Sequence, residues 1–190
     1  MPNAILDPTG TISTSTGTTS AAKQAAPRAP RLASLQGKRV GLLINTKTNA
    51  RPFLEEVGRL LEEKYDVALT RRTKVNFAVP EPEDVIKELA AEADVIITGV
   101  GDCGSCSAAA AADGVVLEAA GVPVAAIITE SFIPTADAMA ALRGAPGYKY
   151  ATTAHPVAVL TEDKVKERAA QVLDDVVALL VAAPAVADEA

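Results

Sequence analysis

From residue 38 onward, the chain alternates between short apolar runs and stretches with helical periodicity. The apolar runs predict strands, and these lie at 39–45, 66–70, 94–100, 122–129 and 148–154. The stretches between them repeat apolar residues at helical spacing or open with proline and acidic residues. They predict helices at 51–65, 82–91, 108–118 and 134–142, and a last long helix that starts after Thr161.

The predicted strands recur about every 28 residues, which is the length of one strand–helix unit. Strands that are apolar along most of their length indicate a parallel sheet covered by helices on both faces. We therefore expect an α/β fold with an open, doubly wound, mostly parallel sheet of about five strands, flavodoxin-like in general plan. One domain would span residues 35–190. No Gly-x-Gly-x-x-Gly pattern follows the first strand, so no dinucleotide cofactor is expected.

Residues 1–34 have a different composition. Positions 9–20 are almost entirely Thr, Ser and Gly, and Ala and Pro dominate the positions that follow. Such a segment buries too little apolar surface to offset the entropy lost on ordering. It predicts a flexible arm over residues 1–34, and draping over a neighbouring subunit is the alternative.

Composition and charge limit the kinds of binding partner and the cellular location that we expect for this chain. Hydrophobic residues make up 49% of the chain, but aromatic residues only 3%, so Val, Leu, Ile and Ala must build the core. The net charge of −6 argues against nucleic acid or an anionic membrane as the main partner. The longest apolar run, 176–187, is too short to span a bilayer. Two nearby cysteines cannot form a disulfide framework, which favours a cytoplasmic location.

Candidate chemistry gathers where the predicted strands end, because open parallel sheets bind ligands beyond the carboxyl ends of their strands. The two cysteines, Cys103 and Cys106, lie on a strand-to-helix turn, where helix N–H groups favour a thiolate. Asp102 precedes them, and His155, the single histidine, follows the last predicted strand. These four are the candidate catalytic residues. The candidate substrate-binding residues are Asn45, Lys47, Gly101, Ser105, Ser107, Thr129, Glu130 and Phe132.

Several of these residues have alternative roles. The cysteines could be small buried residues of a tight turn, and two thiols with one histidine are too few ligands for zinc within one chain. His155, before a proline, could exchange a proton with a thiol or a substrate. Asp102 could carry protons, or it could turn toward a backbone N–H and leave the thiol pKa alone. Lys47 could bind a substrate carboxylate, or it could be a solvated loop residue.

The stretch Asp102 to Ser107, DCGSCS, is similar to the signature of the UGSC family. Members carry selenocysteine or cysteine at the first position of that motif. Further landmarks are Ile5 to Pro8, Leu42 to Lys47, and His155 with Pro156. The resemblance covers most of residues 35–180 and leaves the arm outside. It implies that Cys103 is the attacking residue, that Cys106 is its resolving partner, and that the chemistry is thioredoxin-like.

Three functions remain open. We expect first a cysteine-dependent enzyme of the thiol/disulfide oxidoreductase type, acting on a small-molecule substrate or a thiol partner. The alternative is a non-redox cysteine nucleophile or proton carrier in an isomerase, lyase or hydrolase of a small organic acid. The third is a non-catalytic binding subunit. A second copy of the chain or a longer related subunit is the expected protein partner, and no metal or other cofactor is expected.

Overall fold

The computed structural model describes residues 28–183, and its centre is a sheet of five parallel strands. The strands are β1 (Arg39–Ile44), β2 (Ala68–Thr73), β3 (Val95–Gly101), β4 (Val124–Thr129) and β5 (Ala151–Thr153). Their order across the sheet is β2-β1-β3-β4-β5, and every neighbouring pair runs parallel. This is the strand order of flavodoxin-like sheets, with its switch point between β1 and β3. The α/β, doubly wound prediction is therefore confirmed.

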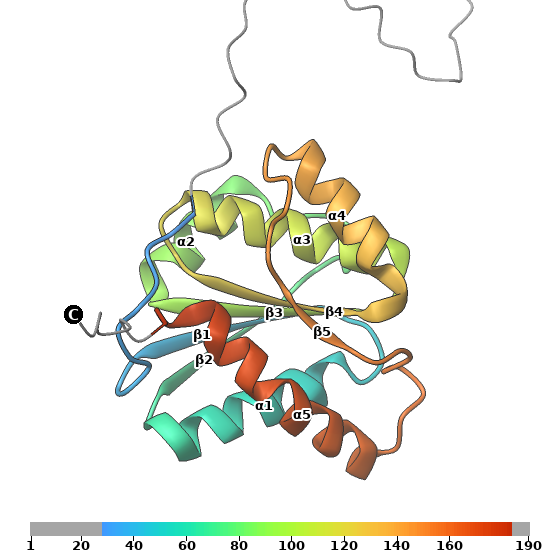
Figure 1. Cartoon of the computed structure of the whole chain (residues 1–190), viewed down its shortest axis with the longest axis horizontal. Coiled ribbons are helices and arrows are strands. Elements are labelled where there is room, and N and C mark those ends of the chain that lie inside the picture. Colours follow the sequence, from blue (N-terminus) through green and yellow to red (C-terminus); the bar gives the residue numbers. More distant parts are fainter. Residues whose placement is uncertain (1–27, 184–190) are drawn as a thin grey trace, which may run out of the picture.

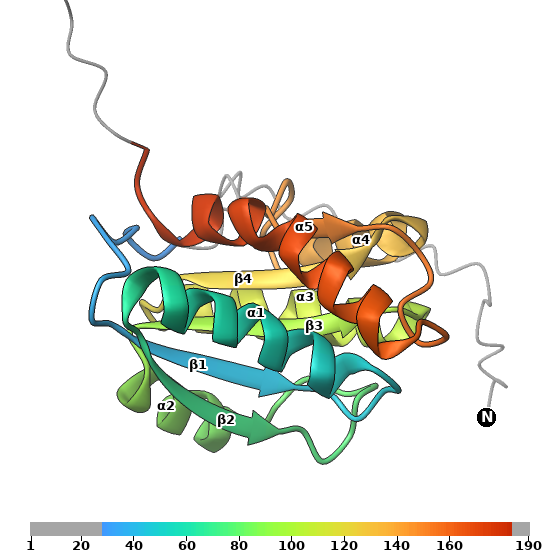
Figure 2. The same ribbon diagram turned by 90° about the horizontal axis from the view of Figure 1, so that it is seen from below.

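Helices cover both faces of the sheet (Figures 1 and 2). Helices α1 (Ala50–Tyr65) and α5 (Glu162–Leu180) lie on one face, and they pack against each other as well as on the sheet. Helices α2 (Glu83–Glu92), α3 (Gly104–Ala119) and α4 (Ile133–Leu142) lie on the other face. A short 3-10 helix, η1 (Glu130–Phe132), joins β4 to α4.

The core is aliphatic, as the scarcity of aromatic residues requires. Under α1 and α5, a large cluster of Leu, Val and Ile side chains from β1, β3 and β4 surrounds the buried ring of Phe53. A smaller cluster under α2 and α3 includes Leu43, Ile96 and Val124. Strand β3 is buried at all seven positions, because it lies at the middle of the sheet between two layers of helices.

Two strands, β2 and β5, differ by three residues at one end from their predicted limits, and the others by one or two. Strand β2 ends at Thr73 rather than at residue 70, although Thr70 to Thr73 are polar. It lies at the edge of the sheet, where polar side chains can face solvent without a cost in burial. Strand β5 spans three residues rather than seven, since only Ala151 to Thr153 pair with β4.

Helix α3 begins at Gly104, four residues earlier than predicted. Its first turn contains Gly and Ser, whose low helix propensity hides the start in the sequence pattern. Cys103 is the N-cap, and its sulfur accepts a hydrogen bond from the backbone N–H of Cys106. The capping bond makes the cysteine turn part of the helix.

Residues 28–35 run along the domain as a strap. The backbone N–H of Ala29 and the side chain of Arg31 bond to Glu118 at the end of α3. Leu32 forms a parallel bridge with Val181 after α5, and Leu35 is fully buried in the core. Residues 28–34, which composition placed in the arm, thus lie against the domain, and residues 1–27 of that arm lie outside the described residues.

A membrane-spanning helix would have to be long and apolar. Within residues 28–183, none of the helices meets both conditions.

Candidate functional site

The cysteine turn follows the central strand β3 and opens α3. Cys103 and Cys106 are joined by a disulfide, and their Cα atoms are 5.2 Å apart, which is within the usual range for such a bond. The sulfur of Cys103 lies 3.2 Å from the backbone nitrogen of Cys106. In the reduced protein this N–H and the dipole of α3 would stabilise a thiolate at Cys103.

The two cysteines differ in access. Cys106 is 1% exposed, whereas Cys103 is partly exposed at the end of the helix. The hydroxyl of Ser105 lies 3.5 Å from the Cys103 sulfur and is exposed. An incoming reagent therefore reaches Cys103 first, and Cys106 lies behind it.

Two of the predicted substrate-binding residues lie beneath the turn. Ser107 is fully buried, and Gly101 packs so closely on it that an added Cβ would lie 2.7 Å from the Ser107 hydroxyl. Neither residue presents a side chain to the surface. The turn can approach β4 and α3 this tightly because position 101 has no side chain.

The Asp102 carboxylate turns away from the cysteines toward the loop between β5 and α5. It accepts hydrogen bonds from the backbone N–H groups of Val157 (3.1 Å) and Ala158 (2.8 Å), and Nδ1 of His155 lies 2.9 Å away. The Asp102 side chain is only 4% exposed. Its negative charge is thus balanced by three donors.

His155 is held on one ring nitrogen. Its Nδ1 lies 3.2 Å from the hydroxyl of Thr129, and that hydroxyl donates to the carbonyl of Gly101 at 3.0 Å. Because Thr129 and Asp102 both accept from Nδ1, they assign the proton of the neutral ring to that atom. The other nitrogen, Nε2, is then left as a proton acceptor. The ring of Phe132 packs edge-on against the imidazole, with centroids 5.3 Å apart.

The residues after β1 take other positions. The Asn45 side chain is buried and bridges the Val100 carbonyl (2.8 Å) and the Lys47 backbone N–H (3.1 Å), so it ties the ends of β1 and β3 together. The Lys47 ammonium lies 4.7 Å from the ring centroid of Phe77, in the loop after β2. Glu130, in η1, is exposed.

Asn49 is not among the candidate site residues named from the sequence, although it follows the first strand. Its side-chain NH2 group, which carries two hydrogens, lies within hydrogen-bond distance of three carbonyls of the loop that carries His155, those of Val157, Ala158 and Leu160. The signal that could have found it is its position just after the first strand, at the same sheet edge as the cysteines.

Asp113, on α3, belongs to a separate buried cluster of charges. It bonds to the ammonium of Lys74 and accepts the backbone N–H of Glu81, and Lys74 also lies 3.8 Å from the Glu81 carboxylate. Burial raises the pKa of Asp113, although the charge of Lys74 opposes the shift. Burial likewise raises the pKa of Glu81, again against Lys74. The cluster fastens the loop after β2 onto the helix that begins at the cysteines.

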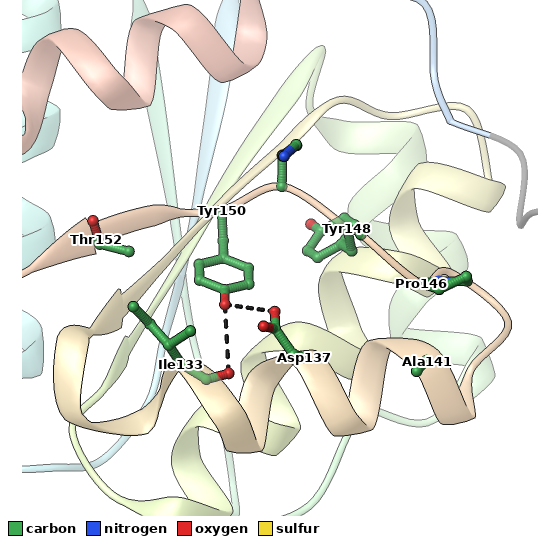
Figure 3. A pocket seen from close by; sticks show the side chains of 9 residues that line it. Ile133, Asp137, Ala141, Pro146, Tyr148, Tyr150 and Thr152 are labelled. Carbon is green, nitrogen blue, oxygen red and sulfur yellow. Dashed lines mark hydrogen bonds between the residues drawn. The ribbon is translucent and has the colours of Figure 1, made fainter.

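A cavity of about 500 Å³ lies away from the cysteines, between α4 and the chain that leads into β5 (Figure 3). The Tyr150 hydroxyl crosses it to Asp137, at 2.7 Å. None of the residues that line it is among the predicted site residues. Within residues 28–183, no three His, Cys, Asp or Glu side chains form a group that could hold a metal ion.

The site therefore brings together Cys103, Cys106, Asp102, His155 and Thr129 along the ends of β3, β4 and β5, with Phe132 against the histidine. Lys47 is directed to the loop after β2, and Ser107 is buried below the turn. This arrangement combines a capped, accessible sulfur with a histidine oriented by a carboxylate.

Comparisons with solved structures find weak, fold-level likeness. A flavodoxin-like domain from Synechococcus sp. is 15% identical, with a TM-score of 0.40, over 73% of this chain and 90% of that chain. An ABC transporter permease from the Pseudomonas fluorescens group is 18% identical, with a TM-score of 0.39, over 74% of this chain and 32% of that chain. A search of functionally curated proteins finds no match.

The sequence profile of the UGSC family matches residues 4–182. The match covers residues 28–182 of the described part of the chain, and it reaches further toward the N-terminus than the resemblance from residues 35–180. It includes the cysteine turn, the loop of His155 and most of the predicted arm. The chain belongs to the UGSC family.

Proposed function

We propose that this chain is a thiol/disulfide oxidoreductase in which Cys103 attacks and Cys106 resolves. The observation that supports it most is the position of the Cys103 sulfur. It caps α3, accepts the Cys106 N–H at 3.2 Å, and is more accessible than the buried Cys106. A capped, accessible sulfur beside a second sulfur within bonding reach is the arrangement that disulfide exchange requires.

The reaction has two exchange steps. The Cys103 thiolate attacks one sulfur of a substrate disulfide, which forms a mixed disulfide and releases the other substrate sulfur as a thiolate. The Cys106 thiolate then attacks the Cys103 sulfur and releases the second substrate thiolate. The substrate disulfide gains two electrons, and the cysteine pair loses two. A dithiol reductant must afterwards restore the reduced pair.

His155 supports this chemistry as a proton carrier. With Nδ1–H donated to Asp102 and Thr129, the free Nε2 can take a proton and return it to a leaving thiolate. Asp102 keeps the ring in that tautomer, and its charge is held by the loop amides. This supports a positioning role for Asp102 in place of the direct proton carrier considered from sequence.

The experiment mixes the fully reduced chain with glutathione disulfide and follows the products by mass spectrometry after acid quenching. We expect the wild type to end as the internal disulfide. Cys106→Ser should stop at the mixed disulfide with glutathione. Cys103→Ser should react more slowly by about tenfold or more, because its remaining thiol is buried.

Two outcomes would contradict the proposal. A mixed disulfide that forms readily in Cys103→Ser but not in Cys106→Ser would reverse the roles of the cysteines. A reduced wild type that gains one glutathione and never closes the internal disulfide would remove the resolving step.

A second candidate is a non-redox cysteine enzyme for a small organic acid, and the His155–Asp102 pair favours it. His155 is oriented by Asp102, the residue before Cys103, and a nucleophile with its base can be built from such a set. Under this alternative, Cys106→Ser keeps full activity on the true substrate while Cys103→Ser loses it. The redox proposal expects both variants to lose turnover.

A further inference from the structure

The loop 155–160, between β5 and α5, is held by side chains from two other strand ends. Asp102, after β3, accepts the N–H groups of Val157 and Ala158. Asn49, after β1, donates to the carbonyls of the same two residues, at 3.0 and 3.3 Å, and to that of Leu160 at 2.9 Å. The N–H groups of this turn are thus bound by one side chain and its carbonyls by another.

Asn49 makes these bonds at the expense of its usual role. It is the N-cap of α1, a position where asparagine normally accepts an N–H of its own helix. Here its side chain makes no such bond. Its backbone is left-handed, with φ 65°, a conformation that asparagine tolerates better than most residues do. The left-handed cap and the three carbonyl bonds across the sheet edge occur together at this one residue.

The Asn49 contacts bear directly on His155, which begins the loop. The imidazole proton is assigned to Nδ1 by Asp102 together with Thr129, and Asp102 accepts the N–H groups of the two loop residues whose carbonyls Asn49 binds. Because β1 is next to β3 in the sheet, Asn49, at the start of α1, and Asp102 lie in the segments that follow two neighbouring strands. A loop held at its N–H groups alone could still rock about the carboxylate.

We propose that Asn49 is a positioning residue that sets the tautomer and placement of His155 through the loop 155–160. The proposal rests on the proposed function for the role of His155 as a proton carrier. The claim that Asn49 positions the loop and the ring does not depend on that function. Asn49 does not itself touch the sulfurs in this arrangement and acts through the loop. Loss of its amide leaves three loop carbonyls without this donor. The loop then holds Asp102, which accepts from Nδ1 of His155, less firmly.

The test compares Asn49→Gly with Asp66→Gly in the full chain. Within residues 28–183, Asp66 is the other non-glycine residue with a left-handed backbone, at φ 49°, and it caps the far end of α1. Both variants therefore place glycine at a positive φ, and only one removes an amide from the loop. Asn49→Asp serves as a second variant of nearly the same size, in which a carboxylate faces the carbonyls.

Three readouts are taken. In Asn49→Gly, hydrogen exchange at the Val157 and Ala158 amides should be about ten- to a hundredfold faster, and Asp66→Gly should leave it unchanged. The ¹⁵N shifts of the His155 ring should move from the Nδ1–H tautomer toward a mixture. The pH profile of mixed-disulfide formation in the Cys106→Ser background should also shift. Asn49→Asp should follow Asn49→Gly in all three.

Each contrary result decides the question. The proposal is overturned if hydrogen exchange at the Val157 and Ala158 amides is unchanged in both Asn49 variants. It is also overturned if Asp66→Gly accelerates this exchange as much as Asn49→Gly does. Faster exchange with an unaltered tautomer and pH profile makes Asn49 a purely structural residue and also overturns it. If the wild type fails to react with glutathione disulfide at all, the proposed function fails, while the exchange and tautomer readouts still test Asn49.

Discussion

At the scale of single residues, the buried carboxylates Asp102, Asp113 and Glu118 each face several donors. Asp102 takes three donors, and Glu118 takes the N–H groups of Ala29 and Val124 together with the Arg31 guanidinium. Lys74 is 2% exposed and faces Asp113, which is fully buried. A buried charge is tolerated only with a partner, so each set should be sensitive to the loss of one member.

Lys74→Met tests the buried cluster on α3. Methionine has about the same side-chain volume as lysine, but it leaves the Asp113 carboxylate without its cation. We therefore expect the free energy of unfolding to fall by about 3–5 kcal/mol. Urea unfolding followed by circular dichroism measures it. The double variant Lys74→Met with Asp113→Leu should recover much of the loss, because no unpaired charge then remains at position 113.

The control is Lys164→Met, which removes an exposed lysine paired with Glu167 on α5. Its midpoint in urea should match the wild type, since exposed ion pairs contribute little. An unchanged midpoint in Lys74→Met would mean that the cluster is not needed for stability.

At the scale of elements, the turn from β3 into α3 determines the site. The register between β3 and β4 shifts between Thr98 and Gly101, and the chain then passes directly into the cysteine cap. Gly101, the last residue of β3, packs closely against Ser107 of α3 and Ile128 of β4. An added Cβ would lie 2.6 Å from Ile128 Cδ1 and 3.0 Å from the Ser107 Cα, and the second contact is with backbone.

Gly101→Ala should therefore destabilise the domain by about 1–3 kcal/mol, because the neighbouring backbone must shift. The shift would also displace Asp102 and Cys103, so the reaction with glutathione disulfide should slow as well. Both effects are measured on the same purified variant, by urea unfolding and by the quenched mass assay.

Gly104→Ala is the matched control for Gly101→Ala. Nothing lies within 4 Å of a Cβ added at Gly104, and the residue is the first of α3. Stability should stay the same or rise by up to about 1 kcal/mol, since alanine is the better helix former. Equal losses in the two variants would contradict the packing explanation at Gly101.

At the scale of the whole molecule, the first described residues pack against the end of the last helix. The strap of residues 28–35 pairs with the end of α5 through Leu32 and Val181, and it is fastened to α3 through Glu118. The strap thus connects helices on opposite faces of the sheet (Figure 1). Glu118 is 3% exposed, so its bonds are protected from water.

Glu118→Gln should release the strap. One of the two acceptor oxygens becomes an NH2 group, which cannot accept the Ala29 or Val124 N–H group that it faces, and Arg31 loses its counter-charge. We expect trypsin to cleave after Arg31 about tenfold faster or more, because strap opening becomes easier. Gel electrophoresis and mass spectrometry of the fragments over time measure the rate.

The control for the strap is Asp137→Asn, which weakens the Tyr150 contact across the cavity of Figure 3. Its cleavage after Arg31 should match that of the wild type. A wild type that is cut there as fast as Glu118→Gln would show that the strap does not depend on this carboxylate.

Much of the fold could be predicted because the strands carry their own signal. The runs around Leu42, Ile97 and Ile127 are apolar on both faces, which only a covered parallel sheet accommodates. The start of α3 and the end of β2 escaped prediction. Helix α3 starts at a turn that is stabilised by the capping sulfur of Cys103 and not by residues of high helix propensity. Strand β2 can end in polar residues, such as Thr73, because it lies at the edge of the sheet.

The candidate site was partly predictable for the same reason. Parallel strands bring their carboxyl ends to one edge, so Cys103, Thr129 and His155 could be grouped without coordinates. The direction in which each side chain points could not be predicted. Lys47 turns toward Phe77, and Ser107 turns into the core, because neighbouring elements decide where each side chain finds a partner.

The strand–helix alternation, the aliphatic core and the cysteine pair at a helix start follow from the sequence alone, because each is encoded in residues near one another in the chain. The carboxylate that orients His155, the difference in access between the two cysteines and the Asn49 contacts with the loop follow only from tertiary packing. The Asp102–His155 pair joins residues 53 positions apart, and the Asn49–Leu160 bond joins residues 111 positions apart. Their contacts exist only after the strand order brings β1, β3, β4 and β5 together at one edge.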